Sequence, residues 1–475
     1  MSATAVAPSA FGEGRADCIY FLMFDSWPRE MRSNRWHYAS RWARHLPVVL
    51  VQPVLTMDDE PSVSLPEPRI PNVRLLKVRT ADPPLSALTT GILQAKQLYE
   101  DMAAHGYSQP ILWTYNPDYL FASEILPASM RVFHATENYF YFDSVSKGFI
   151  ERLKRVLAIS DLVIGVSEGV VASYRPFAKG VAKAVTNGCD FPFYNTRQGD
   201  AIVAQLGEGW EKVAVYAGNI NNRLDFQLLD AAAAANPATH FVFFGPISGI
   251  AGTPDGSRWE MLVSRGNVSY QGAVDVERLP GIFAAAHVGL IPYKSDPILV
   301  DNTFPLKAFE MQSSGLPVVS TDLSALRSEV GPGLLLAAGK AEFIDGVKRV
   351  DRRVLGDDDQ LIMQQKCLAH DYDRKFDAVL ELVTSHLKQG LGISAPGLEL
   401  RGLASAMQNS EKLARLYAPG ASSPASPASP PSEVSIRSPL AERMSQIEAA
   451  VVNGVRSILP RPVRSILKKV LKASP

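Results

Sequence analysis

A lysine and a glutamate stand three residues apart in the segment NTFPLKAFEMQSSGLPVVST, which spans residues 302–321. If this segment begins as a helix, Lys307 and Glu310 lie on roughly the same face of it. An ammonium group can contact a phosphate, and a carboxylate can accept two hydrogen bonds from the hydroxyls of a ribose. The flanking residues are apolar enough to bury this face in part, and buried charges usually have a partner or a role. The pair is therefore a candidate nucleotide site, and an ordinary surface ion pair is the alternative.

The position of the pair within its helix favours the phosphate interpretation. We expect the polar residues Asn302 and Thr303 to cap the helix. Lys307 then lies in the first turn, at the positive end of the helix dipole, where a cation is unfavourable unless an anion binds beside it. Asn302, Thr303, Lys307 and Glu310 are therefore expected to line the site of an anionic ligand.

A glycine turn offers a second phosphate contact. In YAGNINNRLD, residues 216–225, Gly218 follows an apolar run and a helical pattern starts a few residues later. A glycine there lets backbone N–H groups approach a phosphate at a helix N-terminus. Arg223 adds a charge that suits a diphosphate. We take Gly218, Asn219 and Arg223 as candidate ligand residues; a tight turn with Arg223 in solvent is the alternative.

Two loops in the first half of the chain are candidates for a general base and for binding a second substrate. They are DSWPREMRSNRWH (25–37) and FHATENYFYFD (133–143). A general base is a carboxylate or an imidazole within hydrogen-bond reach of the hydroxyl that it deprotonates. The candidate bases are Glu137, which we prefer, His134 and Asp25, and the candidate acceptor contacts are Arg29, Glu30, Arg35 and Tyr139. The alternative is that His134 only ends a strand and Glu137 is a solvated loop acid.

Continuous apolar runs predict the strands that position these loops. In the first half of the chain they are 18–24, 47–53, 111–117, 131–138 and 161–170, and in the second half 212–220, 240–246, 268–274, 288–294 and 317–321. Runs of this kind are typical of parallel strands buried on both faces. Helical patterns lie between many of them, so the chain is expected to form two doubly wound α/β domains. Ligands of such domains bind beyond the carboxyl ends of the strands, where the candidate residues stand.

The composition limits the class of protein. The chain has 475 residues, too many for one core, and it has 48 Lys+Arg against 48 Asp+Glu, which argues against a nucleic-acid partner. Its three cysteines show no metal-ligand spacing, so we expect no metal site and a reducing compartment. The N-terminus lacks the pattern of a signal peptide, and no run reaches the roughly 18 apolar residues that span a bilayer. We therefore expect a cytoplasmic protein.

The segment around Lys307 resembles the nucleotide-sugar segment of GT-B glycosyltransferases, of the GT4-like type found in bacterial polysaccharide biosynthesis. In that group the helix carries a Glu-x7-Glu signature, followed by a small-Gly-x-Pro-Val-Val strand. Glu310 matches the second glutamate, which holds the nucleotide ribose in the family. Asn302 stands where the first glutamate would be, so the chain departs from the pattern at a residue that contacts the donor sugar.

Three further segments extend the resemblance. YAGNINNRLD is similar to the turn that places Gly218 and Arg223 near the diphosphate, and QGAVDVERLPGIFAAAHVGLIPY resembles the stretch whose loop contacts the base near Val274. FHATENYFYFD is similar to a YDxxDD loop, with His134 and Glu137 at its first two acidic positions. The resemblance is specific over about 212–330 and fainter over 18–190.

The resemblance implies a GT-B fold, with two Rossmann-like domains that face a cleft. It also implies an enzyme that transfers a sugar from a nucleotide-diphosphate-sugar co-substrate to a glycan or lipid-linked glycan, with no metal or other cofactor. Two other functions stay open: a non-catalytic protein that binds nucleotide sugars or glycans, and a sugar-nucleotide epimerase. A NAD-linked oxidoreductase is less favoured, because no G-x-G-x-x-G follows the first strand.

The expected division of the chain has six parts. They are a disordered N-terminus (1–16), an acceptor domain (17–204), a nucleotide-sugar domain (205–365), one long amphipathic helix that crosses back to the first domain (366–390), a Ser/Pro/Ala-rich linker (391–432) and a basic tail (433–475). In the tail, apolar residues at helical spacing and cations over 456–472 suggest a short amphipathic helix on an anionic membrane surface. This predicts a peripheral position on the inner face of the cell membrane; a partner-binding tail is the alternative.

Overall fold

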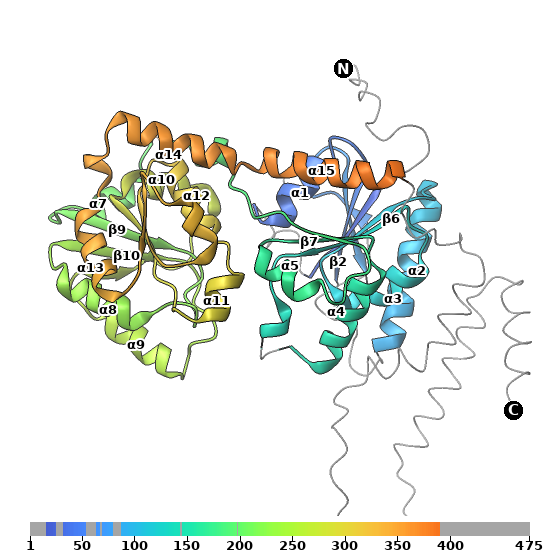
Figure 1. Cartoon of the computed structure of the whole chain (residues 1–475), viewed down its shortest axis with the longest axis horizontal. Coiled ribbons are helices and arrows are strands. Elements are labelled where there is room, and N and C mark those ends of the chain that lie inside the picture. Colours follow the sequence, from blue (N-terminus) through green and yellow to red (C-terminus); the bar gives the residue numbers. More distant parts are fainter. Residues whose placement is uncertain are drawn as a thin grey trace, which may run out of the picture.

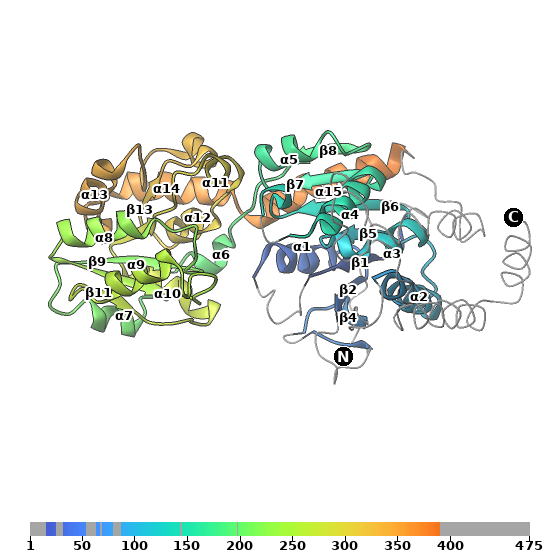
Figure 2. The ribbon, with the colours of Figure 1, turned by 90° about the horizontal axis from the view of Figure 1, so that it is seen from below.

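The computed structural model describes residues 16–24, 32–53, 63–66, 69–78, 87–142, 145–196 and 198–389. They form two α/β lobes that lie side by side, with helices α14 (Asp357–Ala369) and α15 (Tyr372–Gln389) running along one edge of both (Figure 1). Seen from below, the lobes meet at a narrow junction that contains the short helix α6 (Phe191–Tyr194) (Figure 2). The linker, the basic tail and all of the expected disordered N-terminus except Ala16 lie outside the described residues.

The N-terminal lobe contains an eight-stranded sheet with the order β3-β4-β2-β1-β5-β6-β7-β8. All neighbouring strands are parallel except β3 and β4. The strands are β1 (Ile19–Leu22), β2 (Val48–Pro53), β3 (Val63–Ser64), β4 (Val73–Val78), β5 (Ile111–Thr114), β6 (Met130–Ala135), β7 (Leu162–Gly165) and β8 (Val181–Ala184). Both faces are buried, because Tyr20 and Leu22 point into one core while Ile19 and Phe21 point into the other.

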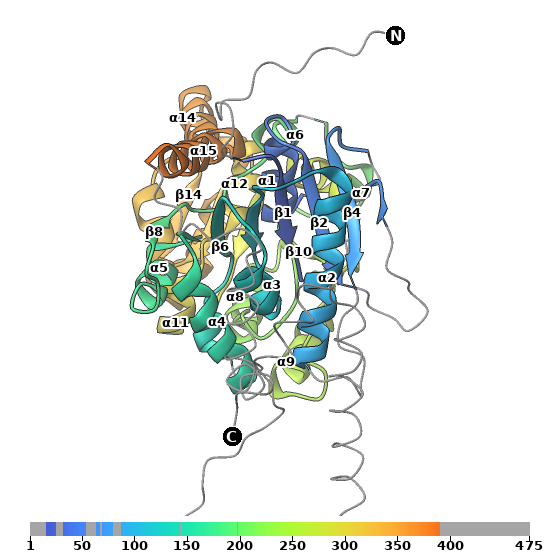
Figure 3. The same ribbon diagram turned by 90° about the vertical axis from the view of Figure 1, so that its right-hand side faces the viewer.

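Different helices cover the two faces of this sheet. One core takes side chains from α2 (Ala87–His105), α3 (Leu120–Ile125), α4 (Lys147–Ile159) and α5 (Glu168–Tyr174). The opposite core takes side chains from α1 (Asn34–Trp42) and from α15, at the far end of the described chain. Viewed along the long axis, α14 and α15 lie together at the edge of the molecule (Figure 3).

The C-terminal lobe contains a six-stranded parallel sheet with the order β11-β10-β9-β12-β13-β14. The strands are β9 (Lys212–Ala217), β10 (Thr239–Phe244), β11 (Val268–Tyr270), β12 (Val288–Ile291), β13 (Val318–Thr321) and β14 (Leu334–Ala337). The helices are α7 (Ala201–Leu206), α8 (Phe226–Ala235), α9 (Pro254–Val263), α10 (Leu279–Ala285), α11 (Pro297–Asn302), α12 (Leu306–Ser313) and α13 (Lys340–Arg349). Cys189, Tyr194 and Val203 already belong to this lobe's core, which therefore begins before the predicted boundary at 205.

The predicted doubly wound α/β architecture is confirmed, and all ten predicted runs contain a strand. The expectation of one unbroken helix over 366–390 is wrong, because α14 ends at Ala369 and α15 begins at Tyr372. Between them the backbone pairs with the first interlobe connection: Cys189 N–H donates to the His370 carbonyl (2.9 Å), and Tyr372 N–H donates to the Cys189 carbonyl (3.0 Å). A strand-like bridge at this point is incompatible with a continuous helix.

Candidate functional site

The topology of the C-terminal sheet identifies where a ligand is expected to bind. The strand order reverses between the neighbours β9 and β12, and crevices at such switch points are the usual ligand sites of open α/β sheets. Gly218 directly follows β9, and Lys307 lies on α12, the second helix after β12. Gly218 and Lys307, which the sequence singled out separately, thus lie at the same edge of the sheet.

Lys307 and Gly218 are in direct contact. A Cβ atom added to Gly218 would lie 2.1 Å from Cε and 2.6 Å from Nζ of Lys307, and the φ angle of Gly218 is +150°. Any other residue at position 218 would therefore displace the lysine and strain the backbone. The glycine is needed here so that the ammonium group can lie against the turn after β9.

Two tyrosines surround the ammonium group. Nζ of Lys307 lies 5.8 Å from the centre of the Tyr216 ring, and the Tyr293 side chain forms a hydrogen bond with it. Burial acts to lower the pKa of Lys307, but Tyr293, Tyr216 and Glu310 outweigh it, so the pKa is raised above its ordinary value. Lys307 therefore stays positively charged at neutral pH and can bind an anion.

The start of α12 differs from the expectation. Asn302 and Thr303 do not cap it, because Asn302 is the last residue of α11 and the N-cap position of α12 is Pro305. Proline offers no side-chain acceptor, and no side chain caps this helix end. Lys307 does lie in the first turn, as expected, and the positive end of the helix dipole adds to the positive charge of the site.

Glu310 lies one turn further along α12, beside Tyr194 of α6. The Tyr194 hydroxyl donates a hydrogen bond to the Glu310 carboxylate. Burial raises the pKa of Glu310, and Lys307 and Tyr194 oppose this shift. As a whole residue, Glu310 is partly buried.

The remaining donor candidates are spread around this edge. Asn219 is exposed, and its side-chain oxygen accepts a hydrogen bond from the Ser248 hydroxyl (2.8 Å). Val274 is half-buried against the core of the lobe, in the loop after β11. The backbone N–H of Thr303 donates to the Leu299 carbonyl (3.1 Å), which continues the last turn of α11. These residues thus lie in loops at the carboxyl edge of the sheet.

Two polar contacts join the loop after β6 to the C-terminal lobe. The Arg223 guanidinium donates to the Glu137 carboxylate (3.2 Å), and the Asn138 side-chain amide donates to the side-chain oxygen of Asn302 (2.8 Å). Glu137, the preferred base, therefore faces the candidate diphosphate residues from the opposite lobe. Asn138 was not singled out from the sequence, since an asparagine between Glu137 and Tyr139 carries no signal of its own.

His134 does not fit the role of a base. Its ring is 1% exposed on β6, stacks on Tyr115 with ring centres 5.1 Å apart, and has Nδ1 3.3 Å from the Tyr115 hydroxyl. Burial, with a smaller effect of Arg35, lowers the pKa of His134 to about 3. A ring at this depth contacts no substrate hydroxyl, so His134 is a core residue.

The burial of His134 predicts a pH-dependent stability. The folded protein keeps this imidazole neutral down to a pKa of about 3, whereas the unfolded chain takes up a proton near the ordinary value of 6.5. The stabilisation is complete above that value and is lost as the pH falls toward 3, by roughly 1.4 kcal/mol per pH unit. The free energy of unfolding is measured in urea at pH 7 and at pH 5. Between these two values it should fall by about 2 kcal/mol more in wild type than in His134→Gln. Equal losses would contradict this account.

The acceptor candidates lie in different settings. Tyr139 is 9% exposed and packs on Phe24 and Phe149, so it belongs to the core and does not fit an acceptor contact. Arg35 is half-buried, donates to the Thr136 hydroxyl (3.3 Å) and lies over the Tyr115 ring. The other candidates of this loop, Asp25, Arg29 and Glu30, lie outside the described residues.

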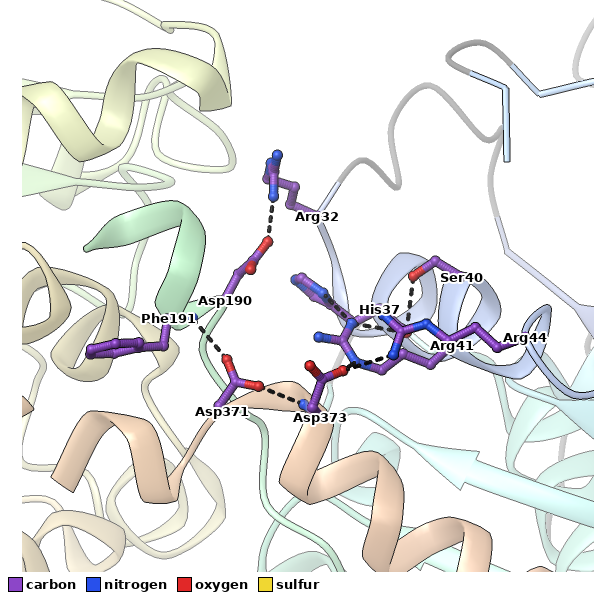
Figure 4. A network of polar contacts seen from close by, with 9 residues as sticks. All are labelled: Arg32, His37, Ser40, Arg41, Arg44, Asp190, Phe191, Asp371 and Asp373. Carbon is purple, nitrogen blue, oxygen red and sulfur yellow. Dashed lines mark hydrogen bonds and ion pairs between the residues drawn. The ribbon is translucent and has the colours of Figure 1, made fainter. Parts of the chain in front are cut away.

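A polar network at the junction was missed by the sequence analysis (Figure 4). The Arg32 guanidinium forms an ion pair with Asp190 and lies over the Phe193 ring, so the end of the 25–37 loop contacts the connection between the lobes. Asp371 accepts the backbone N–H of Phe191 (3.0 Å) and of Asp373 (2.7 Å). The contact of Asp371 with Phe191 joins the two segments in which the chain passes from one lobe to the other. The residues of the network are distant in sequence, so no local pattern indicated them.

Within the described ranges, no group of three or more His, Cys, Asp or Glu side chains is arranged to hold a metal ion. In the same ranges, no helix is both long and apolar enough to span a membrane. Cys18, Cys189 and Cys367 are free and buried.

Most of the C-terminal lobe matches a known sequence family. Residues 211–351 match the family described as Glycosyl transferases group 1, a range that contains Gly218, Arg223, Lys307 and Glu310. Two curated proteins are similar to part of the chain. One is TuaH of Bacillus subtilis, which is named as a teichuronic acid biosynthesis glycosyltransferase. It is 28% identical over 169 residues, and the match covers 35% of this chain and 39% of TuaH. O-antigen chain mannosyltransferase B of Escherichia coli is 25% identical over 212 residues, or 43% of this chain and 53% of that protein.

The matches therefore span about half or less of these two relatives. A solved structure, Anabaena HepE in complex with UDP, superposes with a TM-score of 0.54 at 16% identity, and the match covers 78% of this chain and 100% of HepE. An identity this low indicates a shared fold only. The chain thus contains a Glycosyl transferases group 1 domain over residues 211–351, within a two-lobed GT-B fold.

Proposed function

We propose that this chain is a glycosyltransferase that moves a sugar from a nucleoside-diphosphate-sugar donor to a glycan or lipid-linked glycan acceptor. The observation that carries the proposal is the convergence of Lys307, Gly218 and the uncapped start of α12 at the switch point of the C-terminal sheet. A lysine charge, a close glycine turn and a helix N-terminus without a side-chain cap suit a diphosphate. Glu310 lies three residues beyond Lys307 on α12, and we propose that its carboxylate accepts hydrogen bonds from the hydroxyls of the ribose.

The reaction needs positive charge where the donor diphosphate leaves. The acceptor oxygen forms a bond to the anomeric carbon of the sugar while the bond from that carbon to the phosphate oxygen breaks. The electron pair of the broken bond departs with the nucleoside diphosphate. Lys307, Arg223 and the start of α12 stabilise the charge that develops on it, so these groups take the part of a metal ion in this scheme.

The proton of the acceptor hydroxyl needs a base on the opposite lobe. Among the three candidates, Glu137 is the one that the structure describes next to the donor residues, through its contact with Arg223. We therefore propose that Glu137 accepts this proton and that the acceptor binds along the loop after β6. We also propose that the enzyme is cytoplasmic and acts at the inner face of the membrane, where residues 456–472 would bind anionic lipid.

The names of the relatives support the class of acceptor that we propose. TuaH is named for teichuronic acid biosynthesis, and the Escherichia coli relative is named for the O-antigen chain. Both names concern polysaccharides, which supports a role in polysaccharide biosynthesis for this chain. A non-catalytic binding protein is favoured by only one observation, namely Asn302 at the position of the first family glutamate. Turnover of any nucleotide sugar would exclude that alternative.

A thermal-shift screen tests the donor site. UDP, GDP, ADP and their sugar conjugates are added to wild type and to Glu310→Ala, and the midpoint of unfolding is measured. A ligand at about 100 times its Kd stabilises the folded protein by roughly 2.7 kcal/mol, which gives a clear shift. We expect one nucleotide to stabilise wild type and to have little effect on Glu310→Ala, because that variant lacks the ribose contact.

An exposed carboxylate of the same lobe provides the control. Glu260 lies on α9 and is exposed, so Glu260→Ala should keep the full shift. If the nucleotide raises the midpoint of unfolding of Glu310→Ala as much as that of wild type, Glu310 does not hold the nucleotide. If no nucleotide stabilises wild type, the proposed donor site is wrong.

A further inference from the structure

Arg223, the proposed diphosphate ligand, and Glu137, the proposed base, form an ion pair with each other. Arg223 follows β9 in the C-terminal lobe and Glu137 follows β6 in the N-terminal lobe, and their side chains meet at 3.2 Å between a guanidinium nitrogen and Oε2. Their side chains are 33% and 41% exposed, so neither group is locked in the protein interior. The same guanidinium lies 6.0 Å from the centre of the Phe142 ring.

This ion pair interferes both with diphosphate binding by Arg223 and with the role of Glu137 as the base. A guanidinium that binds a carboxylate presents fewer N–H donors to a diphosphate, and a carboxylate oxygen that accepts from a guanidinium is less available to an acceptor hydroxyl. We propose that Glu137 occupies Arg223 until the donor diphosphate displaces it, so that donor binding frees Glu137 for the acceptor. This inference rests on the proposed function and adds a coupling between its two half-sites.

The surrounding contacts restrict this exchange to the Glu137 side chain. The Tyr174 hydroxyl donates to the Glu137 carbonyl (2.8 Å) and accepts the N–H of Tyr139 (2.9 Å). Asn138, between them, donates to Ser173 and to Asn302, both at 2.8 Å. Since the backbone on both sides of Glu137 is anchored, the carboxylate is expected to change partner by rotation of its own side chain.

The charges explain why the diphosphate displaces the carboxylate. A diphosphate carries at least two negative charges and can bind Arg223, Lys307 and N–H groups together, whereas Glu137 carries one charge. The competing ion pair is partly exposed, and exposed pairs contribute little, so Glu137 should weaken donor binding by only about two- to fivefold. The competition therefore tunes donor affinity and does not block it.

A double-mutant cycle measures the competition. The Kd values of UDP, GDP and ADP are determined by isothermal titration calorimetry for wild type, Glu137→Gln, Arg223→Ala and the double variant. For the nucleotide that binds, Glu137→Gln should tighten binding about two- to fivefold. In the Arg223→Ala background the same change should have no effect. If Glu137→Gln tightens binding equally in both backgrounds, it acts through the general electrostatic field and the inference is wrong.

A second ion pair of similar exposure serves as the control. Asp230 on α8 binds Arg265 at 2.6 Å, and these side chains are 30% and 34% exposed, so Asp230→Asn should leave the Kd unchanged. If nucleotides bind wild type but Glu137→Gln has no effect, this inference fails and the proposed function stands. If no nucleotide binds, the proposed donor site fails and the inference falls with it.

The kinetics of transfer separate this role from a merely structural one. In Glu137→Gln, the KM for the donor should fall while kcat also falls, because the variant removes the competitor and the base together. A variant that only damaged the fold would raise the KM or leave it unchanged. A lower kcat with a raised donor KM would overturn the inference.

Discussion

Lys307→Ala is expected to lower kcat/KM for sugar transfer by about 10²- to 10³-fold, the usual effect of removing one group that stabilises developing charge. The ammonium group lies against Gly218 and, with the uncapped start of α12, supplies positive charge where the diphosphate leaves. An alanine leaves that charge uncompensated in the transition state. Steady-state rates over a range of donor concentrations measure the loss.

The variant Lys307→Met separates charge from packing. Methionine keeps an unbranched apolar stem over Gly218 and removes only the ammonium group. If charge stabilisation is the role of Lys307, both variants lose activity to a similar extent. If Lys307→Met retains activity within threefold of wild type, the lysine acts by packing and the donor site is misassigned. Far-ultraviolet circular dichroism and the midpoint of thermal unfolding establish that both variants are folded.

Phe376→Ala is expected to lower the free energy of unfolding of the N-terminal lobe by about 3–5 kcal/mol. Phe376 lies on α15, is 3% exposed, and its ring centre lies 5.1 Å from that of Trp42 and 5.6 Å from that of His45. Truncation leaves a cavity between α15 and α1 that neighbouring aromatic side chains cannot fill. Urea unfolding followed by tryptophan fluorescence measures the effect, since Trp42 adjoins the site.

The neighbouring residue provides a matched control. Asp377 is exposed on the same helix, so Asp377→Ala should change the free energy of unfolding by no more than about 0.5 kcal/mol. A loss below about 1 kcal/mol in Phe376→Ala would mean that α15 is a surface attachment and not part of the core.

Much of the fold could be predicted because central parallel strands are apolar throughout. Runs such as 18–24 and 240–246 are buried on both faces, and each contains a strand. Strand β4 was missed because Arg74 and Lys77 interrupt its apolar pattern, and β8 because Val181 is exposed at the edge of the sheet. In these strands neighbouring segments decide the conformation, and a single-segment pattern does not contain that information.

The site was predictable where its residues share a helix or a turn. Lys307 and Glu310 are three residues apart on α12, so their common face follows from helical geometry. The contacts of Lys307 with Tyr293 and of Glu310 with Tyr194 join segments distant in sequence, which periodicity cannot detect. The capping prediction failed because Asn302 is the last residue of α11 and Pro305 occupies the N-cap position of α12.

The N-terminal lobe is not continuous in sequence, because α15 supplies one of its layers. Strands β1 and β5 leave the ribosome long before Tyr372, Phe376 and Leu387, which cover the same face in the folded protein. During translation, the aromatic side chains of this face lack their cover while the whole C-terminal lobe is being made. The lobe that is synthesised first is therefore completed last, and its exposed face is where a nascent chain of this protein would need protection from aggregation.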